Sequence, residues 1–206
     1  MRRALLAFLG LAALAALLLH PAGPSAAPPA PKLAAAIFAG GCFWCTEADF
    51  DKIPGVVSTT SGYSGGRLAN PTYEQVSAGG TGHIEVVKVV YDPAKVTYQT
   101  LVARFFRTVD PLDAGGQFCD RGYQYRTAIF VANSAERRIA ESTKARTAGL
   151  LRKPVATLIL PAAPFYAAET YHQDYYKKNP ARYRYYRWRC GREARLAAVW
   201  GKPSTR

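Results

Sequence analysis

Residues 40–45 read Gly-Gly-Cys-Phe-Trp-Cys and follow directly on a short apolar stretch, residues 33–39. The stretch has the length and character of a buried strand, and residues 46–51 are typical of a helix. A strand, a glycine turn and a helix in this order place Cys42 at or beside a helix N-terminus, where backbone N–H groups are unpaired. These groups and the helix dipole favour a thiolate, so we expect the pKa of Cys42 to lie below its ordinary value. Cys42 is therefore the candidate nucleophile.

The spacing of Cys42 and Cys45 is compatible with a dithiol redox couple, half of a zinc site or a structural disulfide. Cys119 and Cys190 stand alone in the sequence, so a four-ligand zinc site is the weakest of the three. A ring of so few residues adds little stability, and this spacing is more typical of reactive pairs than of structural ones. We therefore predict that no disulfide is obligatory for the fold.

The first 27 residues have the pattern of a secretion signal. Arg2 and Arg3 precede an uncharged apolar stretch over residues 4–19, and small residues follow. The stretch is shorter than the roughly 20 residues that span a bilayer, which favours an export signal over a permanent anchor. We expect an exported, periplasmic protein with no stable membrane span after processing. An uncleaved, membrane-tethered form is the alternative, and the cleavage site is left open.

The rest of the chain is predicted to form one catalytic domain. Of the 206 residues, 49% are apolar and 12% aromatic, which is enough material for a single core. The predicted organisation is a signal peptide at residues 1–27, a Pro/Ala tether at 28–34, the catalytic domain at 35–180 and a basic C-terminal tail at 181–206.

Most of the net charge of +13 lies near the C-terminus, where residues 177–206 hold ten Lys or Arg and one acidic residue. Aromatic and basic residues alternate over residues 182–189, as they do on nucleic-acid-binding surfaces. The segment is short, and an export signal argues against a nucleic acid as partner. We therefore expect no nucleic-acid binding, and a basic binding module is a weaker rival function.

The order of predicted elements indicates an α+β fold. Stretches rich in β-branched residues alternate with segments of helical periodicity, and Gly, Pro and Asp residues separate them. This order predicts a mixed or largely antiparallel sheet with helices packed on it, followed by a long irregular C-terminal tail. The predicted strands are residues 33–39, 56–63, 83–91, 125–132 and 155–160, and the predicted helices are 43–53, 73–77, 97–107, 135–148 and 169–178.

Glu85 is the most informative carboxylate. It shares a strand face with Val87 and Val89, and a position on the core side of the sheet would raise its pKa by desolvation. A glutamic acid that is protonated at neutral pH is what a general acid requires. The alternative is a solvated position at the strand end. His83 is either a base for Cys42 or, as is more common, a hydrogen-bonded structural residue.

Other side chains stand at strand ends or in loops from which they can reach the thiol. Tyr63 and Tyr125 can present phenol donors to one pocket, although tyrosines in such places often only pack. Asp120 lies in a Gly-rich loop, and the alternative is that it serves only as a turn residue. Phe43 and Trp44 can supply apolar walls.

A set of motifs together resembles the A-type peptide methionine sulfoxide reductases. The motifs follow one another in order over roughly residues 35–180, and their combination is specific where a single one would be weak. They are Gly41-Cys42-Phe43-Trp44, Gly62-Tyr63-Ser64-Gly65-Gly66, Pro71-Thr72-Tyr73-Glu74-Gln75-Val76, Thr81-Gly82-His83-Ile84-Glu85-Val86-Val87, Tyr91-Asp92-Pro93, Asp120-Arg121-Gly122-Tyr123-Gln124-Tyr125-Arg126 and Tyr171-His172-Gln173.

The resemblance implies a ferredoxin-like α/β plait that reduces the S epimer of methionine sulfoxide, free or in peptides, to methionine. Cys42 resembles the nucleophile that attacks the sulfur and becomes a sulfenic acid, and Glu85 resembles the acid that protonates the oxygen. The other implied roles are donors to that oxygen for Tyr63 and Tyr125, a methyl pocket for Phe43 and Trp44, and substrate binding for Asp120 and His172.

The resemblance leaves the resolving cysteine open. Cys45 stands where glycine is usual, and in the members that share it, it resembles a thiol that condenses with the sulfenic acid to a disulfide. Cys190 lies in the tail, where other members keep their resolving cysteines, and it competes for that role. We favour Cys45, with a relay of the disulfide outward through Cys190 as an option.

The resemblance implies no metal or organic cofactor. A thioredoxin-like protein would supply electrons by thiol-disulfide exchange, and the chain would act as a monomer on oxidised peptides, oxidised proteins and free methionine sulfoxide. A general dithiol-disulfide oxidoreductase is the alternative function, because it also uses Cys-x-x-Cys after a strand. It would need neither Glu85 nor the tyrosines.

Overall fold

The computed structural model describes residues 32–201, so the signal peptide predicted at 1–27 and most of the tether lie outside the described residues. The strands are β1 (Ala34–Gly40), β2 (Val56–Ser64), β3 (Ile84–Tyr91), β4 (Gly116–Gln117), β5 (Asp120–Arg121), β6 (Thr127–Val131), β7 (Leu158–Pro161) and β8 (Phe165–Ala167). The helices are α1 (Phe43–Phe50), α2 (Tyr73–Ser77), α3 (Tyr98–Thr108), α4 (Ser134–Leu151), α5 (Tyr175–Lys178), α6 (Pro180–Arg189) and α7 (Arg192–Trp200), with a 3₁₀ turn at Tyr123–Tyr125.

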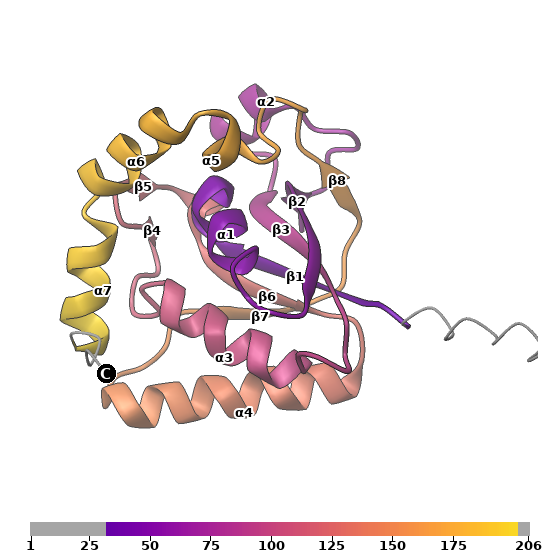
Figure 1. Ribbon diagram of the computed structural model, residues 1–206, viewed down its shortest axis with the longest axis vertical. Coiled ribbons are helices and arrows are strands. Elements are labelled where there is room, and N and C mark those ends of the chain that lie inside the picture. The colour runs from indigo at the N-terminus through magenta and orange to yellow at the C-terminus, as the bar shows by residue number, and fades with distance from the viewer. Residues whose placement is uncertain (1–31, 202–206) are drawn as a thin grey trace, which may run out of the picture. The chain divides into compact units, whose positions relative to one another are not determined.

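The main sheet has the strand order β7-β6-β1-β3-β2-β8 (Figure 1). Its four central strands are antiparallel neighbours, with α1 between β1 and β2 in the chain and α3 between β3 and β6. This is the βαββαβ arrangement of a ferredoxin-like plait. β8 extends one edge in antiparallel fashion and β7 extends the other in parallel. The predicted α+β fold with a mixed sheet is confirmed.

β3 carries the carboxylate of Glu85 into the core. Side chains alternate across a strand, so Glu85 shares its face with Val87 and Val89. Both valines pack in the larger hydrophobic cluster with Phe38 of β1 and with residues of α1 and α3. Glu85 itself is only 3% exposed. The core-facing position is therefore the observed one, and the solvated alternative is wrong.

Thr97 and Asn133 cap α3 and α4, because their side-chain oxygens accept hydrogen bonds from backbone N–H groups of the first turn. α4 is longer than the sequence suggested. Gly149 does not end it, since Leu150 and Leu151 continue the helix and Arg152 takes the left-handed conformation at its end, with φ of 52°.

The C-terminal segment is helical, which corrects the predicted long irregular tail. α6 begins with Pro180 in its first turn, and Gly191 with φ of 66° separates it from α7. Arg187 contacts Asp49 of α1 at 3.0 Å, and the buried Arg192 donates a hydrogen bond to the carbonyl of Thr108. Charged residues of this segment therefore anchor it along one side of the domain (Figure 1).

Smaller differences concern the region before these helices. β7 is shorter than the strand predicted at 155–160, β8 was not predicted, and α5 covers only the end of the helix predicted at 169–178. Within residues 32–201, no helix combines the length and the apolar character needed to cross a bilayer.

Candidate active site

The turn between β1 and α1 depends on Gly41. Its φ of 80° lies in the left-handed region, and a Cβ placed on it would lie 2.5 Å from Cβ of the buried Gln117. The chain therefore turns sharply and passes close to β4. Cys42 follows as the N-cap of α1, without a side-chain capping hydrogen bond, so the predicted place at a helix N-terminus is confirmed.

Cys42 opens onto a cavity of about 70 Å³. Six of the residues that line it were singled out from the sequence, and two were not. The six are Cys42, Phe43, Trp44, Glu85, Asp120 and Tyr125, and the two are Tyr73 and Tyr186.

Glu85 lies at the N-terminus of α1, where its Oε2 accepts a hydrogen bond of 2.9 Å from the backbone N–H of Phe43. Burial raises the pKa of Glu85 to about 8, because the hydrogen bond from Phe43 offsets only part of the desolvation and Asp120 adds to the increase. The side chain is therefore a neutral acid at pH 7. This matches the requirement for a general acid.

The expected low pKa of Cys42 is wrong for this form of the protein. Cys42 is only 7% exposed, and burial raises its pKa well above the ordinary value. The hydrogen bond between the side chains of Cys42 and Cys45 and the nearby carboxylates of Glu85 and Asp120 act in the same direction. One N–H that would stabilise a thiolate, that of Phe43, is already bound to Glu85.

Cys45 lies one turn into α1 and is the second free thiol of the described chain. It is 2% exposed and packs with Ala48 and with Tyr183 of α6. The hydrogen bond from Cys42 lowers the pKa of Cys45 to about 7. Burial acts in the opposite direction, and the positive charges of Arg192 and Arg187 help to lower the pKa. Cys45 is therefore the more acidic member of the pair.

Tyr63 stands directly opposite Glu85 on the neighbouring strand, as a cross-strand pair. Its hydroxyl donates to Oε2 of Glu169 at 2.9 Å, and the Oε1 of Glu169 accepts from the backbone N–H of Tyr73. Tyr63 thus supports the segment that brings Tyr73 to the cavity. Its implied role as a donor to a substrate oxygen requires the bond to Glu169 to be exchanged, and that role stays a prediction.

His172 lies behind the cavity. The indole Nε1 of Trp44 donates to its Nδ1 at 3.0 Å, and the imidazole is only 2% exposed. The ring centroids of His172 and Phe43 are 4.9 Å apart, and the indole of Trp44 stacks on Tyr175 at 3.7 Å. Burial lowers the pKa of His172, so the ring is neutral. Its Nδ1 can therefore accept the hydrogen bond that holds Trp44 in place.

Tyr186 of α6 was not predicted from the sequence. Its hydroxyl donates a short hydrogen bond to Oδ2 of Asp120, and its ring meets the indole of Trp44 edge-on, with centroids 5.8 Å apart. Within residues 182–189 it is surrounded by six other tyrosine or arginine residues, and these form no recognisable motif. No local pattern therefore distinguished it. Tyr73 had a signal, because it lies within one of the motifs that resemble the family, residues 71–76.

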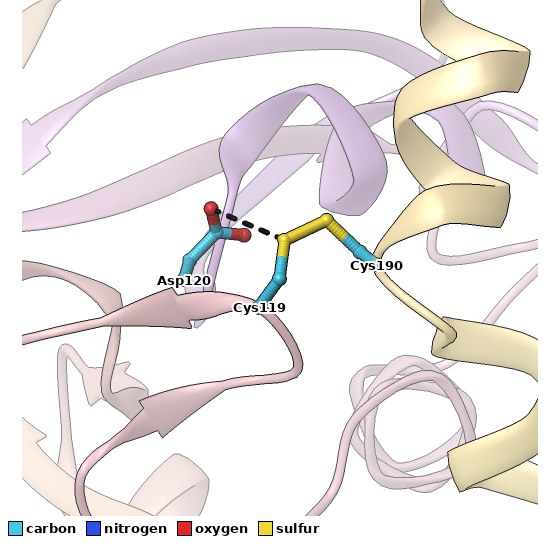
Figure 2. A group of neighbouring side chains, drawn as sticks. All are labelled: Cys119, Asp120 and Cys190. Atoms are coloured by element: carbon cyan, nitrogen blue, oxygen red, sulfur yellow. Dashed lines mark hydrogen bonds between the residues drawn. A yellow bond between two sulfur atoms is a disulfide. The ribbon is translucent and has the colours of Figure 1, made fainter.

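Cys119 and Cys190 are joined in a disulfide beside Asp120 (Figure 2). Cys190 is therefore not a free thiol in this form, and only Cys45 is free to pair with Cys42. Sulfur and carboxylate atoms, which can bind metals, lie close together in Cys119, Asp120 and Cys190. Sulfur atoms that are bonded to each other are not thiolate ligands, so the cluster is not a metal centre while the disulfide is closed.

His83 has a structural role. Its Nδ1 accepts from the backbone N–H of Gly66 at 3.1 Å, and its Nε2 lies 2.8 Å from the carbonyl of Leu68. Both ring nitrogens are used in holding the loop after β2. The structural interpretation is confirmed, and the alternative of a base for Cys42 is wrong.

Comparisons with known proteins point to one family. The sequence model of the family described as peptide methionine sulfoxide reductase matches residues 34–204. The chain is 54% identical over 173 residues to the peptide methionine sulfoxide reductase MsrA 2 of Caulobacter vibrioides, covering 84% of this chain and 88% of that protein.

Two solved structures of Mxr1 from Saccharomyces cerevisiae are similar to this chain. The reduced form has a TM-score of 0.70 and 33% identity, covering 75% of this chain and 89% of that one. The complex with Trx2 has a TM-score of 0.51 and 25% identity, covering 72% and 87%.

Proposed function

We propose how this chain, which belongs to the peptide methionine sulfoxide reductase family, reduces methionine sulfoxide to methionine. One observation carries the proposal. Cys42 and Glu85, a thiol and a neutral carboxylic acid, line the same cavity of about 70 Å³. A thiol that attacks sulfur and an acid that protonates the leaving oxygen are the two groups that this reaction needs.

In the first step, Cys42 attacks the sulfoxide sulfur while Glu85 gives its proton to the oxygen. Cys45 is hydrogen-bonded to Cys42, and its pKa of about 7 keeps part of it as a thiolate at neutral pH. This thiolate accepts the thiol proton of Cys42 as the attack proceeds. The oxygen passes to Cys42, which becomes a sulfenic acid, and methionine is released. Glu85 is left as a carboxylate and regains its proton from solvent.

The substrate binds with its methyl group between Phe43 and Trp44, and Tyr125 donates a hydrogen bond to its oxygen. Burial raises the pKa of Tyr125, so its phenol keeps its proton. Tyr63 is a further donor when its bond to Glu169 opens, and Asp120 orients the substrate. We assign the S epimer as the substrate, free or within peptides and proteins.

Cys45 resolves the sulfenic acid. Its thiol attacks Cys42, a sulfur-sulfur bond forms, and water leaves. The place of Cys45 one turn from Cys42 supports this role, as does the engagement of Cys190 with Cys119. Cys190 is the alternative resolver.

A thioredoxin-like protein restores the two thiols by disulfide exchange, taking the oxidation onto its own cysteines. The similarity to Mxr1, whose crystal structure contains Trx2, supports this choice of partner. The protein acts as a monomer in this proposal, and nucleic acid is not among its partners.

We also propose that the chain is exported and acts in the periplasm. The proposal is supported by the basic, apolar and small residues in succession over residues 1–27. The mass of the mature protein purified from a periplasmic extract tests it. A full-length chain recovered with the cytoplasmic fraction contradicts it.

Turnover of separated S and R epimers of a methionine sulfoxide peptide, with dithiothreitol as reductant, tests the function. We expect turnover of the S epimer alone. Cys42→Ser is the inactive control, and full activity in that variant contradicts the assignment of the nucleophile. Reduction of insulin disulfides at a comparable rate, without turnover of either epimer, would favour the general dithiol-disulfide oxidoreductase instead.

A further inference from the structure

Two residues of the cavity come from elements that a second pair of cysteines joins. Asp120 begins β5 of the hairpin β4-β5, and Tyr186 belongs to α6. Cys119 directly precedes Asp120, and Cys190 ends α6. The Cys119–Cys190 disulfide therefore connects the hairpin to α6 (Figure 2), and each of the two elements supplies a residue that lines the cavity.

The disulfide connects to both cavity residues through short paths. The backbone N–H of Cys190 donates to the carbonyl of Tyr186 at 2.9 Å, so the two residues are one helical turn apart. On the other side, Sγ of Cys119 lies 3.8 Å from Oδ1 of Asp120 (Figure 2). Few rotatable bonds separate the sulfur atoms from the side chains that line the cavity.

Tyr186 and Asp120 contact each other, and Tyr186 also contacts the reacting thiol. The phenol of Tyr186 donates to Oδ2 of Asp120, and it lies within hydrogen-bonding reach of Cys42. Burial and these negative neighbours raise the pKa of Tyr186, so it remains a donor. The placement of one phenol thus sets both the orientation of Asp120 and one wall of the substrate site.

Other contacts hold α6 and α7 on the domain independently of the disulfide. Arg187 contacts Asp49 at 3.0 Å, and Arg195 pairs with the buried Asp110 at 2.6 Å. Arg192 is 2% exposed and donates to the end of α3. We therefore expect both helices to stay docked when the disulfide opens, so that only the covalent restraint between Tyr186 and the hairpin is lost.

We propose that Tyr186 is a positioning residue for the substrate and that the Cys119–Cys190 disulfide holds it in place, so that binding of methionine sulfoxide depends on the state of this second cysteine pair. The inference rests on the proposed function of the Cys42 cavity. Affinity and rate depend on keeping donors within a fraction of an ångström of the groups they orient. The closed disulfide is therefore the form that binds substrate tightly, and the reduced form binds it more weakly.

Binding measured without turnover tests the proposal. A chain with Cys42→Ser and Cys45→Ala is inactive and retains only Cys119 and Cys190, so one disulfide alone can form. Its Kd for a dye-labelled peptide with one methionine S-sulfoxide is measured by fluorescence anisotropy, before and after dithiothreitol. Dithiothreitol becomes its cyclic disulfide, and each cysteine gains one electron and one proton. We expect reduction to raise Kd about 3- to 10-fold, the effect of one misplaced hydrogen bond.

Three further variants of this background separate positioning from general loosening. Adding Cys119→Ser and Cys190→Ser should give the high Kd with or without dithiothreitol. Adding Tyr186→Phe should also raise Kd and should remove most of the response to dithiothreitol, because the two changes act on the same contact. Tyr185→Phe is the matched control, since that side chain is 64% exposed on the same helix and should leave the response intact.

Equal Kd values in the oxidised and reduced forms, with the thiol count confirmed by mass spectrometry, overturn the proposal. Absence of binding by the oxidised form overturns it as well, because that form is expected to bind. A full response that persists in Tyr186→Phe refutes the role of Tyr186. Turnover by the unmodified chain is measured in parallel, so that loss of the proposed function is distinguished from failure of this inference.

Discussion

The backbone N–H of Phe43 and Oε2 of Glu85 form a hydrogen bond of 2.9 Å, which joins the proposed acid to the residue next to the proposed nucleophile. One carboxyl oxygen is thereby fixed, and the other oxygen is free to carry the proton. The same bond removes one donor from the set that would stabilise a Cys42 thiolate. The geometry therefore favours a neutral acid and a neutral thiol before substrate binds.

Glu85→Gln should slow turnover roughly 10²- to 10⁴-fold, the usual contribution of a general acid. Glutamine keeps the size of the side chain and an oxygen that accepts from Phe43, so we expect KM to change little. Steady-state kinetics on the S epimer checks this. A loss confined to KM would show that Glu85 binds substrate without donating a proton.

The pH dependence of kcat/KM should contain a descending limb near pH 8. The pKa of Glu85 is raised to about 8, so the acid form predominates below that pH and is lost as the pH rises through it. Turnover should fall by about tenfold for each further pH unit. The matched control is Glu85→Gln, in which this limb should be absent, and a limb that is unchanged in that variant assigns it to another group.

One equivalent of methionine S-sulfoxide, added to the chain with Cys42 and Cys45 reduced, should produce a Cys42–Cys45 disulfide. Cys119–Cys190 should remain intact, because Cys45 is the free thiol next to Cys42. Peptide mapping by mass spectrometry checks the pairing. Cys190→Ser should form the same new disulfide. A Cys42–Cys190 bond with Cys45 free would refute our choice of resolver.

Reduction of Cys119–Cys190 should lower the free energy of unfolding without unfolding the chain. The two cysteines are 71 residues apart, and a disulfide typically stabilises a protein by about 2–4 kcal/mol, more for longer loops. The ion pairs of Arg187 and Arg195 do not involve the cysteines and should remain after reduction. Urea unfolding followed by circular dichroism, with and without reductant, checks this. Loss of native structure in the absence of urea would show that the disulfide is obligatory after all.

His172→Phe should weaken substrate binding more than it slows chemistry. Phenylalanine retains an aromatic ring beside Phe43 but removes the acceptor for the indole N–H of Trp44. An unpaired indole N–H shifts the methyl pocket, so KM should rise about 3- to 10-fold with kcat nearly unchanged. Steady-state kinetics separates the two constants, and a fall in kcat alone would place His172 in the chemistry.

Local patterns were sufficient to predict the parts of the site that depend on one element. The double glycine and the apolar stretch before it located Cys42 at the start of α1. The two-residue period of β3 predicted that Glu85 lies on the core side of the sheet. Desolvation of a carboxyl group on that apolar face predicted its raised pKa. Both inferences need only the geometry of a strand or a helix.

The parts that depend on distant contacts were not predictable in this way. Tyr186 reaches the cavity because α6 folds back onto α1, and the sequence indicated only a basic tail where the arginines that hold α6 there are found. The pairing of Cys119 with Cys190 joins residues from two elements with no shared motif. The pKa of Cys42 was misjudged for the same reason, since its burial depends on side chains from several elements.

The size of the cavity has a consequence for the part of a substrate that it can hold. A space of about 70 Å³ accommodates only the oxidised end of a side chain, the sulfinyl group and its methyl. The backbone and the flanking residues of the substrate must remain outside. The cavity therefore matches the size of one functional group, and the rest of a substrate would lie against the surface around its opening.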